Sequence, residues 1–227
     1  MAGLNRAYKR RPSMVAMNGG PVLCLDAGSK LSYPGSGITW TDLSGNGNTG
    51  TLVNGPTYDS ANGGSIVFDG VNDHASLPNG LLTGTGDFTV NQFIKAAAGL
   101  TGGTTFANYP SGNLQIFFGL SYMGIWLGNS STYLTGPLPF TTNWTMITAL
   151  RTGTTTAFYI NGNLQKNGSS AITIGDSSMI FRLGNNTTGA GSEKFNGNIS
   201  TTQVYNRALS ATEISTNFNL LRGRYGI

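Results

Sequence analysis

A turn-rich segment contains the residue spacing closest to that of a metal-binding loop. Asp42-x-Ser44-x-Asn46-Gly47 alternates oxygen-bearing side chains and ends on a glycine, as does the first half of a calcium loop. The twelfth position of such a loop is a glutamate that binds the ion with both oxygens, and here it is Val53. Since Asp, Ser and Asn side chains also cap backbone groups in turns, we expect Asp42 to be a turn cap first and a calcium ligand only second.

The residues needed for catalysis are scarce. Glu193 and Glu213 are the only glutamates, and they fall in an expected loop and in an expected helix at the end of the chain. His74 is the only histidine, so the usual zinc site with several His or Cys ligands is not available. The aspartates are scattered at turns, and no Ser-His-Asp set is assembled around His74. We therefore expect His74 to be structural and the protein not to be an enzyme, with no cofactor apart from calcium as a candidate.

Two aromatic residues lie in a segment that alternates in polarity. In a strand over residues 122–127, Met123, Ile125 and Leu127 share one face, whereas Tyr122 and Trp126 share the other. If the aliphatic face is buried, both aromatic rings lie on an outer or concave surface, where they could stack on sugar rings. The alternative is that Trp126 packs in the core.

Positive charge is concentrated in an N-terminal arm, residues 1–20. The arm has four of the 13 basic residues, which leaves nine bases against nine acids in the rest of the chain. A folded nucleic-acid-binding protein more often has a basic face on the domain itself, so nucleic acid is not an expected partner. We expect the arm to dock onto a protein partner, and a solvated tail is the alternative. The residues proposed for docking are Arg6, Tyr8, Lys9, Arg10 and Arg11.

The signals for a cellular compartment are few. Cys24 is the only cysteine and has apolar neighbours, which favours a small core residue. The first twenty residues lack the apolar run of a secretory signal, and no stretch is long and apolar enough to span a membrane. We expect a protein made in a cytoplasm, without a membrane partner.

The composition indicates the elements that must position these residues. A chain of 227 residues with 34 glycines and 10 % charged residues is typical of one all-β domain of short strands joined by tight turns. We expect residues 21–227 to form this domain. The exception is a helix over residues 211–221, which begins at the capping box Ser210-Ala211-Thr212-Glu213 and is expected to pack on the edge of the sandwich.

Four segments together resemble a known superfamily. Over about residues 22–221, DLSGNGNTGTL, SIVFDGVNDHASL, NWTMITALRTGTTTAFYINGNLQ and FNGNISTTQVYNRALSATEI follow one another in the order seen in the laminin-G-like, concanavalin A-like lectin/glucanase superfamily. More narrowly, they resemble the copies of this module in bacteriophage structural proteins. The resemblance implies a two-sheet antiparallel jelly-roll sandwich that is usually non-catalytic, often binds glycans and sometimes holds calcium.

The chain departs from the family pattern at two places. Family members often read FDGxDDY where this chain has Asn72 and His74 in place of an acid and an aromatic residue, which weakens a calcium site built on Asp69 and Asp73. A strand that commonly carries an inward tryptophan has Gln92-Phe93 instead. The resemblance also implies a core that contains the side chains of Trp144, Ile147 and Phe158.

The resemblance and the arm together predict a structural role. We expect a virion protein, made in the host cytoplasm and displayed on a phage particle as a capsid decoration or tail component. Its expected partners are capsid or tail subunits and further copies of itself in the assembly. The alternative is a carbohydrate-binding module for host adhesion, with a cell-surface glycan as its partner.

Overall fold

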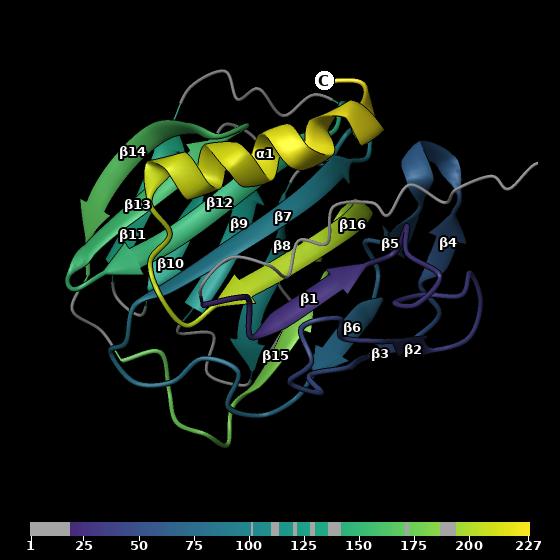
Figure 1. The fold of residues 1–227 in the computed structure, drawn as a ribbon, viewed down its shortest axis with the longest axis horizontal. Coiled ribbons are helices and arrows are strands. Elements are labelled where there is room, and N and C mark those ends of the chain that lie inside the picture. The colour runs from purple at the N-terminus through teal and green to yellow at the C-terminus, as the bar shows by residue number, and fades with distance from the viewer. Residues whose placement is uncertain are drawn as a thin grey trace, which may run out of the picture.

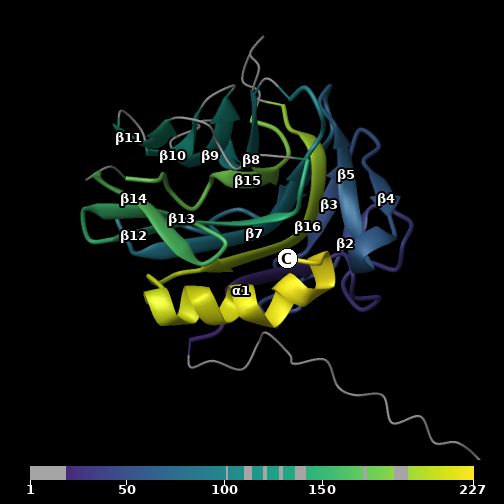
Figure 2. The same cartoon turned by 90° about the horizontal axis from the view of Figure 1, so that it is seen from above.

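Two antiparallel sheets of eight strands each form a sandwich, and one helix lies against one of them (Figure 1). The computed structural model describes residues 19–100, 102–109, 114–119, 122–127, 130–135, 142–170, 173–186 and 194–227. Seen from above, the three layers follow one another as helix, sheet A and sheet B (Figure 2). The predicted all-β jelly roll with one helix near the end of the chain is confirmed.

Sheet A is the central layer. Its spatial order is β14 (Asn163–Ser169), β13 (Thr155–Ile160), β12 (Thr145–Thr152), β7 (Phe88–Ala96), β16 (Asn196–Tyr205), β5 (Ser65–Asp69) and β4 (Thr57–Asp59), and β1 (Leu23–Asp26) also pairs with β16. The turn Asn161-Gly162 joins β13 to β14, and both of its residues have positive φ, as a tight hairpin turn requires.

Sheet B is the outer layer on the side away from the helix. Its spatial order is β11 (Ser130–Thr135), β10 (Tyr122–Leu127), β9 (Leu114–Gly119), β8 (Gly102–Tyr109), β15 (Ile180–Leu183), β6 (His74–Leu77), β3 (Gly50–Val53) and β2 (Thr39–Trp40). Neighbours far apart in the chain, such as β8 and β15, pair directly.

The main hydrophobic core fills the space between the sheets. Alternate residues of β7, among them Phe88, Val90 and Ile94, are fully buried there, as the period of two in a strand dictates. Gln92 has the same inward direction, and Thr105 of sheet B donates a hydrogen bond to its Oε1 at 2.7 Å. Gln92 therefore occupies the inward position in which the family pattern has tryptophan.

A second core lies between sheet A and helix α1 (Ala211–Tyr225). Phe93, on the other face of β7 from Gln92, contributes to it together with Trp144 and Ile214. The expectation that the helix packs on the sandwich edge is wrong, because it lies across the face of sheet A (Figure 2). The predicted core positions of Ile147 and Phe158 are confirmed in the main core, whereas Trp144 is buried in the second one.

Further sequence expectations concern the bounds of the helix, the environment of Cys24 and membrane-spanning segments. The helix begins after Ser210 with the predicted capping box and extends four residues beyond the predicted end at residue 221. Cys24 is buried as predicted, and burial raises the pKa of its thiol to about 12. Among the described residues, no helix is long and apolar enough to cross a membrane.

Candidate functional site

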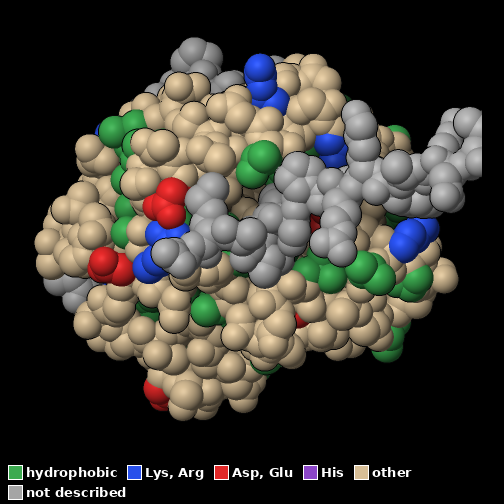
Figure 3. Space-filling view, viewed as in Figure 1, with side chains coloured by type: hydrophobic (Ala, Val, Ile, Leu, Met, Phe, Trp, Pro, Cys, Tyr) green, Lys and Arg blue, Asp and Glu red, His purple; other side chains and the backbone are tan. Residues whose placement is uncertain are grey.

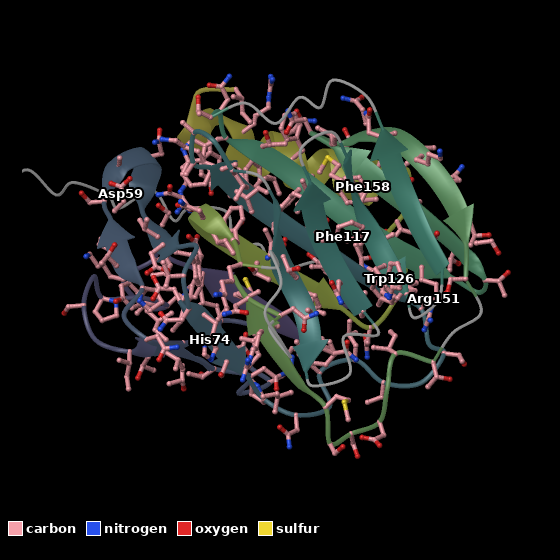
Figure 4. All side chains as sticks on the ribbon, turned by 180° about the vertical axis from the view of Figure 1, so that it is seen from behind. Asp59, His74, Phe117, Trp126, Arg151 and Phe158 are labelled. Carbon is pink, nitrogen blue, oxygen red and sulfur yellow. The ribbon has the colours of Figure 1, made fainter. Side chains whose placement is uncertain are left out.

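The two sheets differ in what covers their outer faces. Helix α1 covers the outer face of sheet A, whereas no described helix lies on the outer face of sheet B (Figure 2). Figure 4 views the molecule from the side of sheet B and labels two aromatic residues of this face, Phe117 on β9 and Trp126 on β10. We call the surface formed by the outward residues of this sheet the sheet B face.

Trp126 is the most informative residue of the sheet B face. Met123, Ile125 and Leu127 of the same strand are 0 %, 0 % and 1 % exposed in the main core. Trp126 alternates with them and therefore points to the other side of the sheet, where it is half-buried. The sequence left two orientations of this strand open. In the structure the aliphatic face is the buried one, and Trp126 does not pack in the core. The side chain of Tyr122, the other predicted residue, lies outside the part of the chain that the structure describes.

A single row of paired residues runs through Trp126 across the whole sheet. Because neighbouring strands lie about 4.8 Å apart, the row forms a continuous line of side chains on the sheet B face. Most of its members are polar, with Arg182 near the middle and Trp126 towards one end. In spatial order the row is Thr39, Thr51, Ser76, Arg182, Ala107, Gln115, Trp126 and Ser131.

A second aromatic residue lies next to this row. Phe117 pairs with Gly124 of β10 and with Thr104 of β8, and its side chain is half-buried. Gly124 has no side chain and lies between Tyr122 and Trp126 along β10. The sheet B face thus carries two half-buried aromatic rings on adjacent strands.

His74 and Arg182 determine the charge on the other half of the sheet B face. His74 is 7 % exposed, and its Nδ1 lies 3.2 Å from the carbonyl oxygen of Asn72. Burial lowers the pKa of His74, and the positive charge of Arg182 lowers it further. Arg182 is therefore the positive charge of this region at neutral pH, and His74 is an uncharged part of the fold.

The structure shows Asp42 as a turn cap. Its Oδ1 accepts hydrogen bonds from the backbone N–H groups of Cys24 (2.8 Å) and Ser44 (2.9 Å). Its Oδ2 accepts from the Ser44 hydroxyl (2.6 Å) and from the backbone N–H of Asn48 (2.9 Å). Both carboxylate oxygens already bind protein donors, so Asp42 does not fit a calcium ligand.

Asp69 and Asp73 close the next turn in the same manner. Asp69 Oδ1 accepts from the backbone N–H of Val71 at 2.7 Å, and Asp73 Oδ2 accepts from the backbone N–H of Asp69 at 3.1 Å. Burial raises the pKa of Asp73. Within the described residues, no group of three or more His, Cys, Asp or Glu side chains could hold a metal ion.

Of the two glutamates, the structure describes only Glu213. Glu213 is the third residue of helix α1, and its pKa falls to about 2 because Arg207 and the Ser210 backbone hydrogen-bond to it. Such a carboxylate stays ionised and is engaged in capping. Glu193 lies outside the described residues, as do the proposed docking residues Arg6, Tyr8, Lys9, Arg10 and Arg11.

A pocket at one end of the sandwich was not predicted from the sequence. It has a volume of about 350 Å³ and lies between the loop that contains Asn46 and Asn48, the loop from Gly80 to Asp87, and Asn206. We call it the end pocket. The only signal in the sequence was the Asn-Gly-rich turn, because segments about 40 and 160 residues further on cannot be placed beside it without the fold.

Charged side chains form no single-sign patch on the helix side of the molecule. In Figure 3 the Lys and Arg side chains of this face are scattered among Asp and Glu side chains, over the surface that is not grey. Two of these bases are already engaged, since Arg207 pairs with Glu213 and Arg224 with Asp26.

Solved structures share this fold at low sequence identity. The binding domain of botulinum neurotoxin serotype G has a TM-score of 0.68 at 17 % identity over 88 % of this chain and 51 % of that one. The serotype D ligand binding domain, solved with N-acetylneuraminic acid, has a TM-score of 0.70 at 14 % identity over 91 % and 52 %. The chain spans about half the length of these toxin domains.

A third structure matches almost end to end. Domain 4 of AbnA, an extracellular arabinanase of Geobacillus stearothermophilus solved with arabinotriose, has a TM-score of 0.66 at 22 % identity over 88 % of this chain and 98 % of that one. The comparison with curated protein sequences gave no match.

One family profile matches most of the sandwich directly from the sequence. It is Laminin_G_3, described as the concanavalin A-like lectin/glucanases superfamily, and it matches residues 69–215. This range runs from the end of β5 to the first turns of helix α1. The chain therefore belongs to the Laminin_G_3 family of the concanavalin A-like lectin/glucanases superfamily.

Proposed function

We propose that this protein is a non-catalytic carbohydrate-binding module that binds an oligosaccharide along the sheet B face. The observation that carries the proposal is the half-buried indole of Trp126 on a sheet face that no described helix covers. An indole ring offers a flat apolar surface and an N–H donor, which suits a sugar ring with one apolar face and a polar rim.

The row through Trp126 supplies the remaining chemistry for a sugar chain. Gln115 lies opposite Trp126 on β9, and Arg182 follows two strands beyond Gln115. Ala107, which is fully buried, separates the two polar residues. An amide, a guanidinium and an aromatic ring in one line provide hydrogen bonds to hydroxyl groups and a stacking surface.

The fold comparisons support a ligand of this kind. The arabinanase domain was solved with arabinotriose and the serotype D domain with N-acetylneuraminic acid, and both share the sandwich. The non-catalytic part of the proposal is supported by Glu213, whose carboxylate caps a helix and has a pKa of about 2. A general acid for glycoside hydrolysis needs a raised pKa.

A binding assay with Trp126 variants tests the proposal. A glycan array identifies the ligand, and calorimetry then compares the wild-type protein with Trp126→Ala and Trp126→Phe. We expect the alanine variant to lose about tenfold in affinity, equal to about 1.4 kcal/mol, and the phenylalanine variant to keep most of it because the stacking surface remains. Leu164→Ala is the matched control, since it removes an apolar side chain that is 49 % exposed on β14 of sheet A.

Two results would contradict this role. One is the absence of any glycan ligand for the folded protein on a broad array. The other is an affinity that Trp126→Ala leaves as unchanged as Leu164→Ala does, in variants with wild-type melting temperatures.

We propose in addition that the basic arm attaches the domain to a virion. The observation in favour is that four basic residues and no acid occur in the first eleven residues, whereas the rest of the chain is balanced. The partners proposed are acidic surfaces of capsid or tail subunits, with several copies of this chain on one particle. The module then faces outward and contacts a cell-surface glycan.

Particle assembly in the host tests the attachment. Particles are produced with a protein that lacks residues 1–20, or with Arg6, Lys9, Arg10 and Arg11 changed to serine, and the bound protein is quantified by mass spectrometry. We expect both variants to be lost from the particles, while a Lys30→Ser and Lys166→Ser control is retained. Retention of the arm variants at the control level would refute the attachment.

A further inference from the structure

The end pocket lies at the end of the sandwich where β1 and β7 begin and β16 ends. These three strand ends lie on the same side of sheet A in Figure 1. Val22 precedes β1, Asp87 precedes β7 and Asn206 follows β16, and all three line the pocket. No residue of the row through Trp126 lines it, so it is a separate feature of the surface.

The pocket combines an apolar floor with a polar rim. Leu81, Leu82 and Ile174 are 7 %, 4 % and 1 % exposed and line its base. Thr83 and Asn206 at the rim are exposed. Ligand sites combine apolar surface with a few placed polar groups in this manner, in volumes of about 300–1,000 Å³, and 350 Å³ is at the lower end of that range.

One wall is held rigid by a buried arginine. Arg151 is 1 % exposed, and its Nη2 donates to the carbonyl oxygens of Gly86 at 2.6 Å and Gly84 at 3.3 Å. The backbone N–H of Ile174 also donates to Gly84 at 2.9 Å. The loop before β7 is therefore held in place by the side chain of Arg151 and by the backbone of Ile174. The pocket is thus preformed.

Asp87 stands at the end of the same wall. Its Oδ1 accepts from the backbone N–H of Gly153 at 2.7 Å, and its Oδ2 accepts from the Thr152 hydroxyl at 3.3 Å. These contacts fix the carboxylate at the exposed end of the pocket. Each oxygen can accept a further hydrogen bond.

The lining also includes the side-chain amides of Asn46 and Asn48. The Asn48 side chain donates its Nδ2 to the carbonyl oxygen of Val22 at 2.7 Å, and the Asn46 side chain donates its Nδ2 to Ser44 Oγ at 3.0 Å. The amide nitrogens are thus engaged with the protein. In the part of the chain that the structure describes, no group donates a hydrogen bond to the Oδ1 of either asparagine.

We infer that the end pocket binds a single neutral sugar ring, such as the terminal residue of a glycan. Its rim offers mainly hydrogen-bond acceptors, namely two amide oxygens and the Asp87 carboxylate, which match a ligand whose hydroxyl groups donate. Its volume of about 350 Å³ suits a single ring. The site shares no residue with the row through Trp126, so it can be tested separately from the function proposed above.

Nuclear magnetic resonance of the full chain tests this site directly. The ¹⁵N-labelled protein is titrated with galactose, glucose, arabinose and N-acetylglucosamine, and the amide signals of Gly84, Gly86, Asn46 and Asn48 are followed. We expect at least one sugar to shift these signals in a saturable manner with a dissociation constant of about 1 mM, as is reasonable for so small a ligand.

Four variants test whether the binding is specific to the end pocket. Thr83→Trp places a bulky ring at the rim and should weaken binding by tenfold or more, and Asn206→Ala should weaken it several-fold. Thr154→Trp is the matched control, since Thr154 is exposed in a turn and does not line the pocket. Trp126→Ala should leave the affinity at the end pocket unchanged while weakening binding on the sheet B face about tenfold.

Each contrary outcome overturns the inference. Signals that do not shift with any of the four sugars rule out the site, and so does a shift that Thr83→Trp leaves intact. Loss of binding in Thr154→Trp to the same extent as in Thr83→Trp would show that the effect is not local. If calcium chloride alone shifts the same signals and the sugars do not, the pocket is a cation site instead.

Discussion

Asp42 connects two segments that are distant in the chain, and its removal should destabilise the fold. It is 9 % exposed and accepts four hydrogen bonds, among them one from the backbone of Cys24 on β1 and one from Asn48. We expect Asp42→Ala to lower the free energy of unfolding by about 3 kcal/mol, because buried backbone donors lose a charged acceptor. Urea unfolding measures the change.

The control for Asp42 is another aspartate that caps a turn at the surface. Asp59 accepts one hydrogen bond, from the backbone N–H of Ala61 at 2.9 Å, so Asp59→Ala should cost less than about 1 kcal/mol. Calcium should not change the stability of the wild-type protein through Asp42. A calcium-dependent stabilisation that disappears in Asp42→Ala would contradict the capping role.

Glu213 should make stability depend on pH in the acidic range. Its pKa is lowered from 4.5 to about 2, chiefly by hydrogen bonds from Arg207. Because the folded pKa lies below the unfolded one, the contribution is fully present above about pH 4.5 and is lost as the pH falls towards 2. Glu213→Gln lacks this charge, so its melting temperature should fall less steeply than that of the wild type between these pH values. Parallel curves for the two proteins would contradict the assignment.

At the scale of elements, the last turn of helix α1 is held by a single arginine. Arg224 donates to Asp26 Oδ1 at 2.6 Å, to the carbonyl oxygen of Gly64 at 2.9 Å and to Ser200 Oγ at 2.7 Å. These groups belong to β1, to the turn before β5 and to β16. The side chains of Arg224 and Asp26 are only 12 % and 15 % exposed, so the pair is shielded from water.

Two neighbouring arginines provide a matched test of this anchor. Arg224→Ala should lower the free energy of unfolding by about 3 kcal/mol, because it leaves a largely buried carboxylate without its cation. Arg222→Ala should cost less than about 1 kcal/mol, since Arg222 is exposed and only packs over the Phe218 ring at 5.8 Å. Equal small effects, measured by chemical denaturation, would show that Arg224 is not an anchor.

The same element shows which structure can be predicted from sequence. The helix start was predictable because the capping box is formed by residues within four positions of each other. The helix end was not, because Arg224 fixes the last turn through residues about 160 and 200 positions earlier in the chain. Similarly, the alternation in β10 showed which residues share a face of that strand, since it is a local pattern, but it left open which face is buried.

Two features could not be predicted from local sequence patterns. One is which core each face of sheet A supports, and the other is the row of residues on the sheet B face. Both faces of β7 and β12 are buried, one by sheet B and one by the helix, so alternation cannot tell which core receives Trp144. The row on the sheet B face requires the register of eight strands, including the pairing of β15 with β8 and β6. Trp126 was therefore predicted as a candidate, whereas Gln115 and Arg182 were not.

At the scale of the whole molecule, sheet A is shared by two hydrophobic cores. On β7, Phe93 packs towards the helix while Ile94 packs towards sheet B, and on β12 Met146 and Ile147 divide in the same way. Because β7 and β12 contribute side chains to both cores, unfolding of either strand disrupts both cores at once. The helix and both sheets should therefore unfold as one cooperative unit.

The three tryptophans allow this cooperativity to be tested layer by layer. Trp40 lies in the main core, Trp144 in the core beneath the helix and Trp126 on the sheet B face. Three variants that each keep one tryptophan and replace the other two with phenylalanine report on one layer each. Their fluorescence transitions in urea should coincide with the loss of circular dichroism for each variant.

A substitution beneath the helix should then shift the urea transitions reported by all three tryptophans equally. Ile214 is fully buried against sheet A, so Ile214→Ala should cost about 2–4 kcal/mol, and it should move the transitions seen by Trp40 and Trp126 as far as the one seen by Trp144. Leu220→Ala, on the same helix but 44 % exposed, should move none of them by a comparable amount. If Ile214→Ala shifts only the Trp144 transition, the helix is a detachable cover, and the open face of sheet A that it would leave behind becomes a second surface on which a partner could bind.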